Sequence, residues 1–97
     1  MDQNMEHAFI SAYMANREKA ARMGVRMRPL TEENVLRDAH RCLSGHRESD
    51  GFSVLADKQH WELSLEALVV DKRFTALFSY SEANTALSRL LAAGYRF

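Results

Sequence analysis

Apolar and polar residues alternate along much of the second half of the chain. Apolar side chains hold every second position over 61–70, and the same spacing recurs over 73–80, where aromatic residues are frequent. Alternation with a period of two is typical of a strand that buries one face. The two runs therefore predict two strands, joined by a tight connection at Asp71-Lys72. A shorter alternating run over 52–56 predicts a strand before them.

A helix over residues 58–70 is the alternative for the longest run. A helical wheel scatters Glu62, Ser64 and Glu66 among the apolar residues, whereas alternation separates the two classes cleanly. The pattern thus favours a strand. That strand would carry Glu62 and Glu66 on a solvated face.

Helical spacing of apolar residues appears at both ends of the chain. Residues 5–23 form one such segment, and Gly24 follows as a stop signal. The last segment begins after Ser81, which we interpret as its N-cap. It ends before Gly94, at the position where a helix commonly has a left-handed residue.

A further helix is predicted in the first half of the chain. Thr31 has the features of its N-cap, and Leu30 and Val35 stand at the two positions of a hydrophobic staple. Gly45 is expected to end it. The residue before Pro29 is restricted to extended conformations, so a non-helical connector should separate this helix from the first one.

These elements follow one another in the order α-α-β-β-β-α. The sequence therefore predicts an α+β fold with two N-terminal helices, an antiparallel three-stranded β-meander and a C-terminal helix. Residues 95–97 offer a short additional edge strand. A chain of 97 residues is long enough for one core, so residues 1–97 should form a single domain.

The first helix has more apolar surface than a single contact face requires. Phe9 and Tyr13 belong to a broad apolar side, while Ile10, Met14 and Ala21 form a second, narrower strip. Together the two cover about twice the ~100° of an ordinary surface helix. We expect one side to pack on the sheet and the other to contact a partner, most simply a second copy in a homodimer. The alternative is that both sides are covered within one chain.

A basic stretch follows in the same region. It contains Glu18 as its single acidic residue, and its members are Arg17, Lys19, Arg22, Arg26 and Arg28. Such a stretch, between two helices, allows a helix-turn-helix-like arrangement that contacts phosphates. The chain as a whole has 13 basic and 13 acidic residues, without the excess of basic residues that is usual in nucleic-acid binders. Nucleic-acid binding is therefore the second hypothesis.

Residue types that carry chemistry are few. His40, Cys42 and His46 are the one cluster with metal-like residue types, but His40 and Cys42 are about 200° apart on a helix, and no fourth ligand is nearby. Cys42 falls on an apolar face, which is unfavourable for a nucleophile. Glycine-rich phosphate loops and serine-nucleophile motifs are absent. We therefore expect no catalytic, cofactor or metal site.

The composition of the chain indicates the class of protein and its compartment. A hydrophobic content of 46% with 27% charged residues is ordinary for a soluble domain, and no apolar run approaches the ~20 residues of a membrane helix. The start of the chain lacks the pattern of a secretory signal, and the single cysteine fits a reducing compartment. The sequence predicts a small, non-catalytic cytoplasmic protein that acts through protein–protein interaction, as a homodimeric binding or regulatory module.

Overall fold

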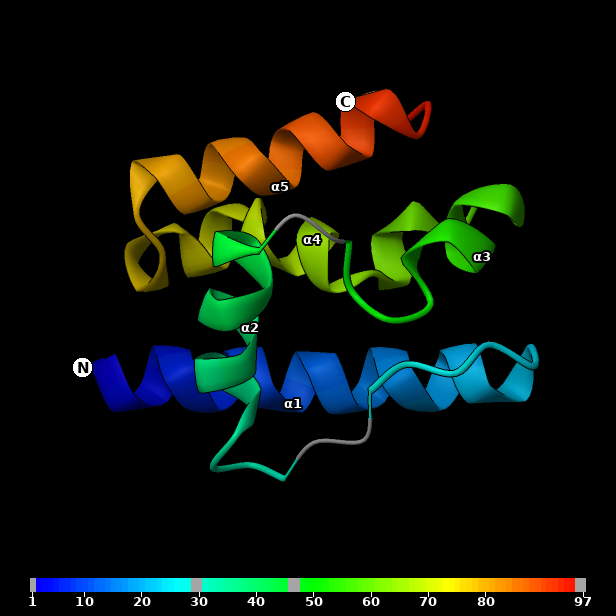
Figure 1. Cartoon of the computed structure of the whole chain (residues 1–97). Helices are drawn as coiled ribbons and strands as arrows, with labels where there is room; N and C mark the ends of the chain where they lie inside the picture. Colours follow the sequence, from blue (N-terminus) through cyan, green and yellow to red (C-terminus); the bar gives the residue numbers. More distant parts are fainter. Residues whose placement is uncertain (1, 29–30, 46–47, 96–97) are drawn as a thin grey trace.

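The computed structural model describes residues 2–28, 31–45 and 48–95 (Figure 1). These residues form α-helices and short 3₁₀ helices, without a strand in any of the three ranges. The predicted α+β fold with a three-stranded meander is therefore wrong. The elements are α1 (Asp2–Arg22), α2 (Val35–Ser44), α3 (Phe52–Asp57), η1 (Trp61–Leu63), α4 (Leu65–Val69), η2 (Lys72–Leu77) and α5 (Tyr80–Ala92).

The helices are arranged in three layers (Figure 1). Helix α1 forms one outer layer and α5 the other, while the short helices from α3 to η2 lie between them. Helix α2 runs across the others. The middle layer is consequently covered on both sides, and it supplies much of the core.

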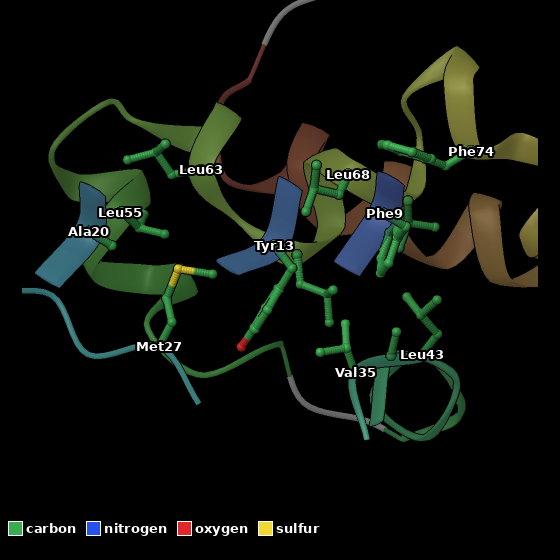
Figure 2. Packing of buried hydrophobic residues seen from close by; sticks show 14 of the residues in the cluster. Phe9, Tyr13, Ala20, Met27, Val35, Leu43, Leu55, Leu63, Leu68 and Phe74 are labelled. Carbon is green, nitrogen blue, oxygen red and sulfur yellow. The ribbon is translucent and has the colours of Figure 1, made fainter. Parts of the chain in front are cut away.

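Buried side chains from α1, α2 and the middle layer meet in one apolar cluster (Figure 2). Phe9 lies at the centre of its aromatic part, with ring centroids 5.3 Å from those of both Phe74 and Phe78. Aromatic pairs at this separation add to the stabilisation from buried area. Other members that Figure 2 labels are Tyr13, Ala20, Met27, Val35, Leu43, Leu55, Leu63 and Leu68.

Helix α1 confirms the prediction for residues 5–23, with Gly24 just beyond its end at φ +80°. Helix α2 differs from its prediction at the start. It begins at Val35 rather than after Thr31, because Thr31 opens a turn in which its carbonyl accepts the Asn34 amide at 2.9 Å. Gly45 ends the helix as predicted. Leu30, half of the predicted staple, lies outside the described residues.

The segment predicted as the long strand is two short helices, η1 and α4. Ser64 lies between them, donating to the Trp61 carbonyl at 2.7 Å and accepting the Ala67 amide at 3.1 Å as the N-cap of α4. The alternation over 61–70 does not separate a buried face from an exposed one. The middle layer is covered on both sides, so neighbouring residues in this segment are buried alike. Even Glu66, expected on a solvated face, is completely buried.

The run over 73–80 is not a strand either: it comprises most of η2, two extended residues, Phe78 and Ser79, and the first residue of α5. Asp71 caps η2 by accepting the Arg73 amide at 2.9 Å, so the predicted tight connection is a helix start. Phe74 on η2 and Phe78 just after it both pack against the Phe9 ring.

The run predicted as the first strand, over 52–56, forms α3. Phe52 and Leu55 are buried there, whereas Val54 is exposed, which separates residues that the strand prediction placed on one face. Of the proposed edge strand 95–97, the last two residues lie outside the described ranges. Tyr95 contacts the Trp61 ring, with centroids 5.7 Å apart.

Helix α5 starts two residues earlier than the sequence indicated, at a capping box instead of Ser81. The Ser79 hydroxyl accepts the Glu82 amide at 3.1 Å, and the Glu82 carboxylate accepts the Ser79 amide at 2.8 Å. These reciprocal bonds satisfy two donors at the helix start. The end is as predicted, with Gly94 at φ +98°.

Glu82 also joins α5 to α2, through a 2.5 Å contact with His40 Nδ1. Burial raises the pKa of Glu82, but the Ser79 amide and His40 outweigh it and hold that pKa below its usual 4.5. A lowered folded-state pKa stabilises the fold above pH 4.5, and this stabilisation is lost as the pH falls through the folded-state pKa. We expect the free energy of unfolding to decline below pH 4.5 less steeply in Glu82→Gln than in the wild type. Urea unfolding at pH values on both sides of 4.5 checks this, and equal declines would contradict it.

Candidate interaction surface

An open groove lies beside the C-terminal half of α1. Its second wall is the connector 24–28, which runs back along α1 after the helix ends (Figure 1). The groove has a volume of about 1100 Å³. Its lining residues are Met14, Arg17, Glu18, Ala21, Gly24, Val25, Arg26, Met27, Arg28 and Asp50.

The connector alternates between buried and exposed residues. Val25 and Met27 are buried, whereas Arg26 and Arg28 are exposed. This arrangement leaves apolar side chains beneath the connector and places two arginines at the surface. The groove therefore combines apolar and cationic character.

Three contacts hold the connector in place. The Val25 amide donates to the Ala20 carbonyl at 2.9 Å, and the Tyr13 hydroxyl donates to the Arg28 carbonyl at 2.7 Å. Gly51 packs so closely against the connector that a Cβ atom at this position would lie 2.8 Å from the Arg26 carbonyl oxygen. The groove wall is thus fixed at both ends and in the middle.

Tyr13 remains a hydrogen-bond donor over the whole physiological pH range. Burial, followed by the charge of Asp38, raises its pKa to about 12. Figure 2 shows its ring within the apolar cluster and its hydroxyl at the edge of that cluster. The hydroxyl is therefore protonated at physiological pH and keeps its hydrogen bond to the Arg28 carbonyl.

The predicted interface residues are divided by the structure. Phe9 and Tyr13 belong to the core of the chain itself. Ile10 and Met14 are half-buried against that core, and Ala21 is exposed. Met14 and Ala21 line the groove, whereas Ile10 does not.

The predicted basic set is divided as well. Arg17, Arg26 and Arg28 line the groove, while Lys19 and Arg22 are exposed elsewhere. Two of the five basic residues have acidic partners, because Arg22 pairs with Glu18 at 3.0 Å and Arg28 with Asp38 at 3.5 Å.

Arg17 and Arg26 form no ion pair with any residue in the described ranges. Their charges are therefore available to a molecule bound in the groove. Apolar and basic residues that the sequence indicated for two different functions thus meet on one surface.

A second polar feature, which the sequence analysis missed, is a buried ion pair. Glu66 accepts hydrogen bonds from the Ser49 amide at 2.8 Å and the Ser49 hydroxyl at 2.6 Å, and Arg89 lies 3.4 Å away. Arg89 also donates to the carbonyls of Cys42 and Gly45, both at 3.1 Å. The sequence contained a partial signal, since Arg89 lies three residues after the buried Ala86 on the same side of α5, but its spacing does not identify Glu66 as the partner.

This ion pair joins α2, α4, α5 and the turn that contains Ser49. No buried side-chain polar atom among the described residues lacks a hydrogen-bond partner. Burial, followed by the charge of Glu66, raises the pKa of the Cys42 thiol, and Arg89 only partly offsets this. A protonated thiol is a poor nucleophile. The geometry of this cluster is that of a structural cross-link.

Among the residues that the structure describes, no group of three or more histidine, cysteine, aspartate or glutamate side chains is arranged to hold a metal ion. Of the cluster considered from sequence, His46 lies outside those parts, and His40 contacts Glu82 instead. None of the described helices has both the length and the apolar character needed to cross a membrane.

Comparison with known proteins finds no matching family model, no similar curated protein and no similar solved structure. The geometry of the groove is therefore the basis for assigning a function.

Proposed function

We propose that this protein is a non-catalytic interaction module that binds another protein surface in the groove between α1 and the connector 24–28. The observation that carries the proposal is the composition of that groove. Met14 provides an adaptable, half-buried apolar side chain beside the exposed Ala21, and Arg17 and Arg26 provide charges without an ion-pair partner among the described residues. Methionine and arginine are both enriched where proteins bind one another.

The state of the reactive residue types supports binding over catalysis. Glu66 and Arg89 are committed to each other and to neighbouring backbone and hydroxyl groups. The raised pKa of Cys42 keeps its thiol protonated at neutral pH. These side chains serve to hold the helices together, and the groove is lined by none of them.

The distribution of charge favours a protein over a nucleic acid as the bound molecule. Phosphate binding needs cations gathered on one face. Here Lys19 and Arg22 lie outside the groove, and Glu18 and Asp50 lie within its lining. The anionic backbone of a nucleic acid in the groove would lie against both carboxylates, whereas a protein surface can supply charges of both signs.

Site-specific photo-crosslinking tests this proposal. A benzophenone amino acid replaces Ala21, which is exposed in the groove, and in a control protein it replaces Ala76, which is exposed on η2. After irradiation in cells, we expect discrete protein adducts from position 21 that are absent from position 76. Equal labelling from both positions, or nucleic acid joined to position 21, would refute the assignment.

A further inference from the structure

A short turn over residues 49–51 contacts both of the polar features described above, the groove and the buried ion pair. The Phe52 amide closes this turn by donating to the Ser49 carbonyl at 3.1 Å. Ser49 faces the ion pair, Asp50 lines the groove, and Gly51 packs against the connector. Three consecutive residues therefore join an internal cluster to the surface where we place the bound protein.

The inner end of the turn is held by both oxygens of the Glu66 carboxylate. The Ser49 hydroxyl donates to Oε1 at 2.6 Å, and the Ser49 amide donates to Oε2 at 2.8 Å. Glu66 is completely buried, and Arg89 lies 3.4 Å from the same carboxylate. Hydrogen bonds to an ionised group are roughly twice as strong as bonds between neutral groups. The two bonds therefore anchor the turn to α4.

The outer end of the turn supports the groove wall. A Cβ atom at Gly51 would lie 2.8 Å from the Arg26 carbonyl oxygen and 3.1 Å from Val25 Cγ1. The backbone of the turn is thus in direct contact with the middle of the connector. Any displacement of the turn changes the support of the connector at this point.

The wall needs this support because it borders a second hollow. That hollow has a volume of about 470 Å³, and it shares Met27, Arg28 and Asp50 with the groove. Cys42 and Ser49 also line it. Since the connector borders both hollows at residues 27–28, little packing holds it there, and its contact with the turn has more influence on its position.

We propose that Glu66 is a positioning residue for the groove: it holds Ser49, and through the turn 49–51 it determines where the connector lies along α1. Glu66 is not part of the groove lining, so it acts on a bound protein only through this turn. The inference rests on the proposed function and explains how the shape of that site is maintained. Loss of the Ser49 bonds releases the wall while the helices stay folded.

Ser49→Ala tests the inference, because it removes the hydroxyl donor and leaves the Glu66–Arg89 pair in place. Ser79→Ala is the matched control, since it also removes one serine hydroxyl, the cap of α5. NMR measures amide hydrogen exchange at each residue. Relative to amides inside α5, the Val25 amide should exchange about tenfold faster in Ser49→Ala, the cost of one hydrogen bond to a charged group. In Ser79→Ala the exchange of Val25 should not change.

The single cysteine provides a second readout that needs no added probe site. Cys42 and Ser49 line the same hollow behind the wall. Release of the turn exposes the thiol to solvent, so N-ethylmaleimide should alkylate Cys42 about tenfold faster in Ser49→Ala than in Ser79→Ala, in line with the same local opening.

Exchange at Val25 that is no faster than inside α5, or equal alkylation of Cys42 in the two variants, would overturn the inference. The benzophenone at position 21 gives the readout for binding. Adducts should decline in Ser49→Ala and not in Ser79→Ala, and equal adducts despite a released wall would overturn the role of the turn in binding. A released wall in a protein whose wild type forms no adducts would refute the proposed function and leave the positioning of the wall intact.

Discussion

Replacing Arg89 by alanine is expected to lower the free energy of unfolding by about 3–5 kcal/mol, the usual cost of removing one partner from a buried ion pair. Glu66 is completely buried, and Arg89 is the cation that faces it. Without Arg89, the carboxylate would keep only the two hydrogen bonds from Ser49. The last carbonyl groups of α2 would also lose the donor that Arg89 supplies.

Urea unfolding followed by tryptophan fluorescence measures this effect. Trp61 is the single tryptophan, and its indole nitrogen donates to the Ala93 carbonyl at 3.2 Å, so its emission reports on the contact between η1 and the end of α5. Arg22→Ala is the matched control, since Arg22 and Glu18 form an exposed ion pair whose loss should change the stability little. Similar stabilities of the Arg89 and Arg22 variants would show that the buried pair contributes nothing.

Replacing Gly51 by alanine is expected to destabilise the protein by about 3 kcal/mol, from left-handed strain and from overpacking. Gly51 has φ +84°, and its new Cβ would lie 2.8 Å from the Arg26 carbonyl oxygen and 3.1 Å from the Val25 side chain. Backbone must shift to relieve the first contact. The atoms that must move belong to the connector, so the groove wall should be displaced.

Gly24 provides a control for the strain alone. Its φ of +80° is nearly the same, but nothing lies within 4 Å of a Cβ atom built there. Gly24→Ala should cost about 1 kcal/mol, the penalty of a left-handed alanine. The difference between the two variants, measured by the same urea titration, isolates the contact between Gly51 and the connector. A difference close to zero would mean that this contact does not fix the groove wall.

The sequence was sufficient to locate α1, α2 and α5 and their C-terminal ends, although not the starts of α2 and α5, because each helix has one buried face. Helix α1 and its end at Gly24, the end of α2 at Gly45 and the end of α5 at Gly94 all follow the predicted pattern. These helices have solvent on one side, so the spacing of their apolar residues reports their geometry.

The middle layer could not be predicted in this way because both of its sides are covered. Leu63 to Glu66 are buried without interruption, and a short buried run has no period that separates a helix from a strand. Local capping was the better signal. Ser79 and Glu82 have the spacing of a capping box, which indicates a helix start that alternation obscured.

The candidate site was predicted as two unrelated halves. The apolar strip with Met14 and Ala21 and the basic residues around Arg26 become one groove because the connector returns along α1. That return depends on Gly51, 25 residues further along the chain than Arg26, and periodicity contains no information on such a contact. The Glu66–Arg89 pair was missed for the same reason.

The identity of the molecule crosslinked to position 21 tests most directly whether the groove is a binding surface. We predict a protein adduct from the groove position, at twice the mass of the chain if the occupant is a second copy, and no corresponding adduct from position 76. A nucleic-acid adduct, or labelling that does not distinguish the two positions, would contradict the role assigned to the groove.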